Sequence, residues 1–217
     1  MARFAVHIIK RCPFVRGVFI SGELSIGSTG PGSDVDFLIV TAPGRLWIAR
    51  ALLIMFKKVF LLNRKKFFCV NSFVSTDHLA IAERNIYQAT EVAHVKAAHN
   101  DALLRAFHAA NQWVRDYFPN FEPSELSRPP IPPSRPSRLQ SLLELPFRLI
   151  PADLLDAWLM RMMERTWARR YPRFDAATRS CIFRCTRTES RAYAGNFQDR
   201  ILARYGERIR SLGVQHD

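Results

Sequence analysis

The sequence predicts an α+β fold, with a small mixed sheet flanked by helices and followed by a helical C-terminal part. Short β-branched and aromatic runs alternate with segments of helical spacing over roughly the first 120 residues. Nine of the 13 prolines then fall within residues 119–151, where they interrupt regular structure. Beyond them, apolar residues recur at intervals of three and four, which is the periodicity of helices.

Two strands joined by a glycine-rich turn form the predicted centre of the fold. After a short amphipathic helix at residues 2–11, the runs at residues 16–20 and 34–40 are short and rich in β-branched and aromatic residues. The turn between them, residues 21–33, contains four of the nine glycines of the chain. Such a turn indicates backbone at positive φ or a close approach between the backbone and a ligand.

The rest of the chain is predicted to contain one more strand and several helices. A long helix at residues 45–62 leads to a largely buried third strand at residues 67–75. Further helices are predicted at residues 83–98, 101–118, 139–149, 152–171 and 197–212. We therefore expect three parts, which are a domain at residues 1–118, a proline-rich linker or strap at 119–151, and a basic helical region at 152–217.

The charge of the chain favours a polyanionic partner. The formal net charge is +13, and 13 arginines but only five acidic residues lie between Arg161 and Arg210. A nucleic acid, an anionic membrane surface or a phosphate-rich substrate would each fit this excess, and charge alone does not choose among them.

The sequence predicts neither a disulfide framework, nor a zinc site, nor a membrane span. The four cysteines lie apart, without a C-x-x-C pair or zinc-ligand spacing, which is typical of reduced thiols in a cytoplasmic protein. The most apolar segment, residues 46–62, carries Arg50, Lys57 and Lys58 and lacks the roughly 20 uncharged residues of a transmembrane helix. We therefore expect a cytoplasmic protein with no transmembrane span.

Asp34 and Asp36 are the candidate metal-binding residues. They lie two residues apart at the start of the second strand, so both carboxylates face one side of the sheet. Two neighbouring carboxylates repel each other, and a divalent metal ion is the usual means of stabilising such a pair. The turn before them offers backbone N–H groups to phosphate oxygens. Together these features indicate metal-dependent chemistry on a nucleotide.

The register of residues 22–36 resembles the signature of the DNA polymerase β-like nucleotidyltransferase superfamily. Gly22 and Gly27 match its two glycines, and Ser33-Asp34-Val35-Asp36 matches the element that opens its second strand. The later segments GRLWIAR, AANQWVRDYFPN and GNFQDRILARY are similar, more loosely, to small bacterial proteins with a nucleotidyltransferase domain.

The resemblance implies a nucleotidyltransferase core in which Asp34 and Asp36 are catalytic and bind Mg²⁺ or Mn²⁺. The substrate would be an NTP, with its phosphates held by residues of the turn and its flanks, namely Ser21, Gly22, Ser25, Gly27 and Ser33. The nucleoside monophosphate would pass to an unknown acceptor, and pyrophosphate would leave.

Two departures from the family pattern motivate alternative hypotheses. Glu23 stands where the family places a serine, and the strand at residues 67–75 has no third acid, although Asp77 follows its end. One alternative is a catalytically impaired nucleotide-binding protein of the same fold. The basic residues between Arg161 and Arg210 and between Lys57 and Lys66 motivate a further alternative, which is a basic adaptor for nucleic acid or a membrane surface.

Overall fold

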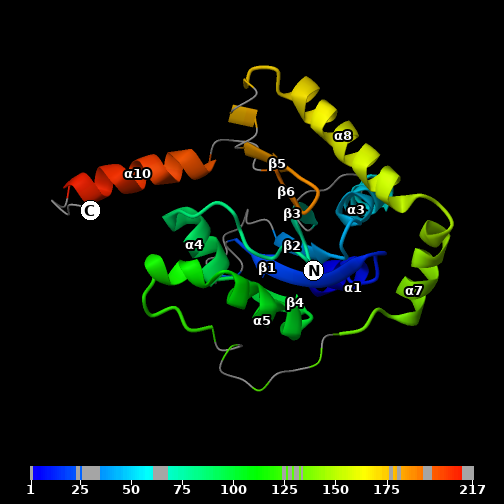
Figure 1. Cartoon of the computed structure of the whole chain (residues 1–217). Helices are drawn as coiled ribbons and strands as arrows, with labels where there is room; N and C mark the ends of the chain where they lie inside the picture. Colours follow the sequence, from blue (N-terminus) through cyan, green and yellow to red (C-terminus); the bar gives the residue numbers. More distant parts are fainter. Residues whose placement is uncertain are drawn as a thin grey trace.

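In the part of the chain that the structure describes, six strands form one mixed sheet in the order β4-β1-β2-β3-β6-β5 (Figure 1). The computed structural model describes residues 2–22, 25, 35–60, 68–123, 126, 129, 132, 134–175, 178–179, 182–192 and 197–211. The strands are β1 (Val15–Ser21), β2 (Asp36–Thr41), β3 (Cys69–Ser75), β4 (Lys96–His99), β5 (Phe183–Cys185) and β6 (Glu189–Ala192). The helices are α1 (Ala2–Ile9), α3 (Leu46–Phe60), α4 (Ile86–Ala93), α5 (Asp101–Ala110), η1 (Gln112–Asp116), α7 (Arg138–Glu144), η2 (Leu145–Arg148), α8 (Ala152–Arg170) and α10 (Phe197–Ser211).

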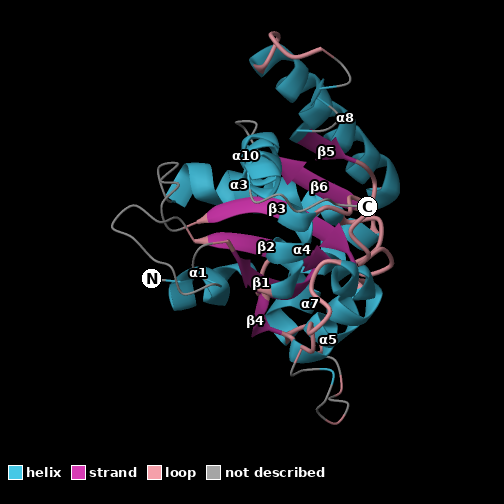
Figure 2. Ribbon diagram, turned by 90° about the vertical axis from the view of Figure 1, so that its left-hand side faces the viewer, coloured by secondary structure: helices cyan, strands magenta, loops and turns pink. Residues whose placement is uncertain are grey.

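Strand β2 lies near the middle of the sheet and has both kinds of neighbour. It pairs antiparallel with β1 and parallel with β3, and helix α3 connects the two parallel strands. Strand β4 lies on the other side of β1, while β6 and β5 extend the sheet beyond β3. Figure 2 shows the strands side by side with helices around them. The predicted α+β class is confirmed, and the three predicted strands are present with ends shifted by one or two residues.

Successive side chains of β2 belong to two hydrophobic cores, one on each face of the sheet. Phe37 and Ile39 point to the face covered by α1, α3 and α8. Leu38 and Val40 point to the opposite face, which α4 and α5 cover. Successive residues of a strand point to opposite faces, and burial on both faces explains the continuous apolar run of this strand.

The predicted helix at residues 83–98 is wrong in its second half. Helix α4 begins after its N-cap Asn85, whose side chain accepts the N–H of Gln88, and it ends at Ala93. The following segment, Lys96–His99, is the edge strand β4, which pairs with β1. The free edge of β1 offers hydrogen bonds that override the helical preference of an alanine-rich segment.

The helix predicted at residues 101–118 divides into α5 and the 3₁₀ helix η1. Asn111 lies between them, and its buried side-chain oxygen accepts the N–H of Ile81 and the indole N–H of Trp113. Its amide nitrogen donates to the carbonyl of Leu79 at 3.0 Å. These contacts with a distant segment explain why α5 ends before Asn111, although no helix-breaking residue is present there.

The C-terminal region is not purely helical, contrary to the prediction. Helices α8 and α10 are present, but residues 183–192 form the hairpin β5–β6, which pairs with β3. Each of these strands is only three or four residues long and carries charged side chains, so no alternation of apolar residues marks it. The hairpin makes the C-terminal region part of the same sheet as the N-terminal strands.

Helix α7 is joined to the N-terminal strand by side-chain hydrogen bonds. The amide of Gln140 donates to the carbonyls of Cys12 and Val15 at 2.9 and 2.6 Å. Glu144 accepts two bonds from the guanidinium of Arg16, at 2.8 and 3.0 Å. The exposed residues 134–137, at the end of the proline-rich segment, therefore lead into a helix that packs back against β1.

Helix α3 carries a charged side chain into the core. The guanidinium of Arg50 lies 5.1 Å from the ring centre of Phe73 and 5.4 Å from that of Trp167. Aromatic faces stabilise a cation, while burial lowers the pKa of Arg50 to about 10. Across the described residues, no helix combines the length and apolar character that crossing a membrane requires.

Candidate functional site

Asp36 lies at the end of the sheet where β1 ends and where β2 and β3 begin. It is the first residue of β2, opposite Ser21 at the end of antiparallel β1 and beside Cys69 at the start of parallel β3. Leu38, two residues later, packs against the helices α4 and α5, so alternation directs Asp36 to the same face. Two of the predicted site residues, Ser21 and Asp36, are therefore paired neighbours.

Gly22 approaches the carboxylate of Asp36 so closely that no side chain fits between them. A Cβ atom on Gly22 would lie 2.8 Å from Oδ2 of Asp36, and the residue has φ of +68°. Both observations require glycine, because a β-carbon would clash and L-residues rarely adopt this backbone conformation. The positive φ expected in the glycine-rich turn is confirmed at this position.

Ser25 closes the turn that begins at Gly22. Its side chain is buried, and its hydroxyl donates to the carbonyl of Gly22 at 2.7 Å while its backbone N–H donates to the same oxygen at 3.0 Å. The hydroxyl therefore serves the geometry of the turn in this structure. The other predicted site residues, Gly27, Ser33 and Asp34, lie outside the described residues, as does Glu23.

A second carboxylate, that of Glu91 on α4, lies near Asp36 and was not among the predicted site residues. It accepts a hydrogen bond from the backbone N–H of Gly22. Burial, and after it the charge of Asp36, raise the pKa of Glu91 above its ordinary value, against the smaller opposing effects of the Gly22 N–H and His94. In the sequence, Glu91 is marked only as an acidic residue next to the buried Val92 of a helix, and many helices share this pattern.

Asp77 is too far from Asp36 to share a ligand with it. Strand β3 runs parallel to β2, so its first residue lies beside Asp36 and its last, Ser75, beside Thr41 at the other end. Five residues of strand separate the two ends by roughly 17 Å. Asp77, which accepts a hydrogen bond from the Ser75 hydroxyl, lies past the far end. The strand register therefore excludes Asp77 as a third acid beside Asp36.

Asp36 and Glu91 offer the oxygen ligands that Mg²⁺ and Mn²⁺ prefer. The charge of Asp36 raises the pKa of Glu91, and a divalent cation between the two would relieve that repulsion. The described residues contain no group of three or more His, Cys, Asp and Glu side chains that could hold a metal ion. Asp34, two residues before Asp36 in the sequence, lies outside the described residues.

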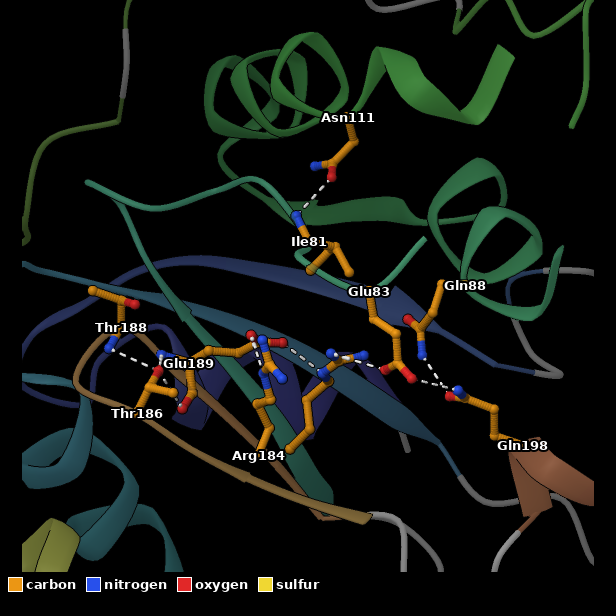
Figure 3. Close-up of polar contacts among 10 residues, drawn as sticks. Ile81, Glu83, Gln88, Asn111, Arg184, Thr186, Thr188, Glu189 and Gln198 are labelled. Carbon is orange, nitrogen blue, oxygen red and sulfur yellow. Dashed lines mark hydrogen bonds and ion pairs between the residues drawn. The ribbon is translucent and has the colours of Figure 1, made fainter. Parts of the chain in front are cut away.

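A polar network fixes α4 against the C-terminal region (Figure 3). Gln88 of α4 donates to Gln198 of α10 at 2.9 Å, and Gln198 donates to Glu83 at 2.7 Å. Glu83 in turn lies 3.5 Å from the buried guanidinium of Arg191 in β6. Since Gln88 lies one turn before Glu91, these contacts also hold the helix that carries Glu91.

Comparisons of the chain with protein-family models, with curated proteins and with solved structures found no match.

Proposed function

We propose that this protein is a metal-dependent nucleotidyltransferase that transfers a nucleoside monophosphate from an NTP to an acceptor. The observation that supports the proposal is the proximity of Gly22, Asp36 and Glu91 at the start of β2. A carboxylate pair beside a tight glycine turn offers ligands for a divalent ion next to backbone that can approach phosphate closely. This combination suits a nucleotide that binds with its metal.

Each residue of the site has a defined role in this proposal. Asp34 and Asp36 would hold Mg²⁺ or Mn²⁺, with Glu91 of α4 as a further carboxylate near Asp36. The ion, when bound, would neutralise charge on the triphosphate and acidify the hydroxyl of the acceptor. Because Gly22 donates its N–H to Glu91, the turn residues up to Ser33 would provide the donors for phosphate.

Pyrophosphate release and calorimetric titration with each of the four NTPs, in the presence of Mg²⁺ or Mn²⁺, test this function. We expect Asp36→Asn to lower metal-dependent nucleotide binding or turnover about 100-fold or more, because it removes a charged ligand. Asp77→Asn is the matched control, because that carboxylate lies at the other end of the sheet. Wild-type protein that neither binds nor turns over any NTP would contradict the proposal, as would equal losses in the two variants.

A nucleotide-binding protein without turnover is the second candidate function. Glu23 favours it, because an ionised carboxylate repels the phosphate that a serine would bind. It predicts a calorimetric signal for NTP and metal but no pyrophosphate. Glu23→Ser would then raise NTP affinity without restoring turnover, whereas an active enzyme releases pyrophosphate before any substitution is made.

A further inference from the structure

Helices α7 and α8 follow one another on the outer edge of the molecule (Figure 1). The segment that they form with η2 exposes large apolar side chains. Leu149 is 86% exposed, Leu154 70% and Trp158 58%. Leu142, Leu145 and Ile150 are exposed beside them in the chain. Isolated exposed apolar residues are ordinary in proteins, but a continuous set of this size marks a surface for interaction.

The outward side of α8 is both apolar and basic. At about 100° per residue, one sector of roughly 100° contains six exposed residues. They are Leu154, Trp158 and Met162, which recur every four residues, and Arg161, Arg165 and Arg169, which do the same. The opposite side of the helix bears the buried Asp156 and Trp167 and packs against α3. The apolar part of the sector lies toward the start of the helix and the basic part toward its end.

The acidic residues of this segment are directed into the molecule or away from that sector. Glu144 is paired with Arg16, Asp153 with Arg45, and Asp156 with the start of α3. Glu164, the remaining acid of α8, lies near Cys185 in β5, whose pKa is raised by burial and, after it, by the charge of Glu164. Within the described part of the chain, no carboxylate is bonded to the guanidinium groups of the sector. Its positive charge is therefore available to an outside partner.

We propose that this surface, from Leu142 to Arg169, docks on the face of an anionic phospholipid bilayer. Leucine, isoleucine and tryptophan at the boundary between headgroups and acyl chains, with arginines beside the headgroup phosphates, are the combination that holds a helix flat on such a surface. A second copy of the chain fits less well, because the same sector of the partner would add three more arginines and no acid to pair with any of them. A nucleic acid would leave the leucines without a partner.

The protein provides its own fluorescent reporter for this test. Trp158 is exposed, whereas Trp47, Trp113 and Trp167 are buried in the core. We expect vesicles of phosphatidylcholine with phosphatidylglycerol to shift the emission to the blue and to protect it from aqueous quenchers. The shift should be absent with Trp158→Phe, which should still co-sediment with the vesicles. Neutral phosphatidylcholine vesicles should bind far more weakly.

Charge-reversal variants separate this surface from the general basicity of the protein. We expect Arg161→Glu/Arg165→Glu to weaken co-sedimentation with anionic vesicles at least about tenfold. Arg200→Glu/Arg204→Glu, on the exposed side of α10, changes the charge equally and should leave most of the binding. Leu149→Ser/Leu154→Ser should weaken binding without unfolding the protein, since both side chains are exposed.

Four results would overturn the proposal. The first two are failure of the wild-type protein to bind anionic vesicles and equal loss in the α8 and α10 charge variants. The others are a dimer by light scattering that Leu149→Ser/Leu154→Ser dissociates, and specific binding to nucleic acid with no affinity for vesicles. None of these measurements depends on nucleotide turnover, so they test the surface independently of the proposed enzyme activity.

Discussion

The carboxylate of Asp156 accepts the backbone N–H of Trp47 at 2.8 Å, although 109 residues separate the two along the chain. The same oxygen accepts the N–H of Ile48 at 3.0 Å. These are N–H groups of the first turn of α3, which have no partner within their own helix. Asp156 therefore performs from α8 the task that an N-cap residue performs locally, and it joins the two helices in doing so.

We predict that Asp156→Ala destabilises the protein by about 2–3 kcal/mol, because it leaves two buried N–H groups without an acceptor. Asp156→Asn keeps an acceptor oxygen and removes a buried charge, so its stability near neutral pH should be within about 1 kcal/mol of wild type. Burial raises the pKa of Asp156. Denaturant unfolding of both variants checks this, and equal losses would show that the charge itself is required.

Gly22→Ala should cost about 1–2 kcal/mol of stability and should also displace Asp36. The backbone has positive φ, and the new methyl group would lie 2.8 Å from Oδ2 of Asp36. Gly206→Ala is the control, because a Cβ in that position of α10 meets nothing within 4 Å. Alanine should stabilise that helix by about 0.5–1 kcal/mol. Thermal unfolding of the pair should give shifts of opposite sign.

Glu91→Gln should make the metal-free protein more stable near neutral pH. Because the pKa of Glu91 in the folded protein is raised above the ordinary 4.5, its stabilising contribution is complete below 4.5 and is lost as the pH rises through the folded value. Glutamine does not titrate and can still accept the Gly22 N–H. The variant should therefore gain over wild type at about pH 7 and lose that gain at about pH 4. Parallel pH dependences in denaturant unfolding would contradict the raised pKa of Glu91, which burial and, after it, the charge of Asp36 cause.

The buried pair of Arg191 and Glu189 on β6 should be far more sensitive to substitution than the partly exposed Arg184 beside it. Nε of Arg191 lies 2.6 Å from Oε1 of Glu189, and both side chains are almost completely buried. Arg191→Met leaves Glu189 as a buried charge without this partner and should cost about 3–5 kcal/mol. Arg184→Met, which removes the 3.2 Å contact to the other oxygen of Glu189 from a partly exposed position, should cost about 1 kcal/mol or less. Comparable losses in urea unfolding would contradict this ranking.

The central elements could be predicted from the sequence because each carries its signal locally. The apolar run after Asp36 and the long amphipathic helix after Gly44 are recognisable without knowing what they contact, and both are present. Strands β4, β5 and β6 are short and polar, and they are strands because a neighbouring strand offers an edge. No local pattern encodes that edge.

The residues of the candidate site also differ in whether a local sequence pattern indicates them. The sequence identifies Asp36 and Gly22, because the spacing of a carboxylate and a glycine around a turn is local information. It does not identify Glu91, which lies 55 residues after Asp36 on a helix whose rotation about its axis depends on packing. The family pattern would place a further acid on the strand at residues 67–75, which has none, whereas Glu91 comes from a helix that covers the sheet.

The pairing of β6 with β3 also has a consequence for the nascent chain. During synthesis, β3 is complete at Ser75, but the strand that covers its free edge begins only at Glu189. At 5–20 residues per second, the ribosome needs roughly 6 to 23 s to make the intervening segment. Throughout that interval, a strand with the apolar residues Phe73 and Val74 presents unpaired backbone groups, as edge strands prone to aggregation do. The order in which the strands are made therefore places the greatest demand for chaperone protection before the C-terminal hairpin emerges.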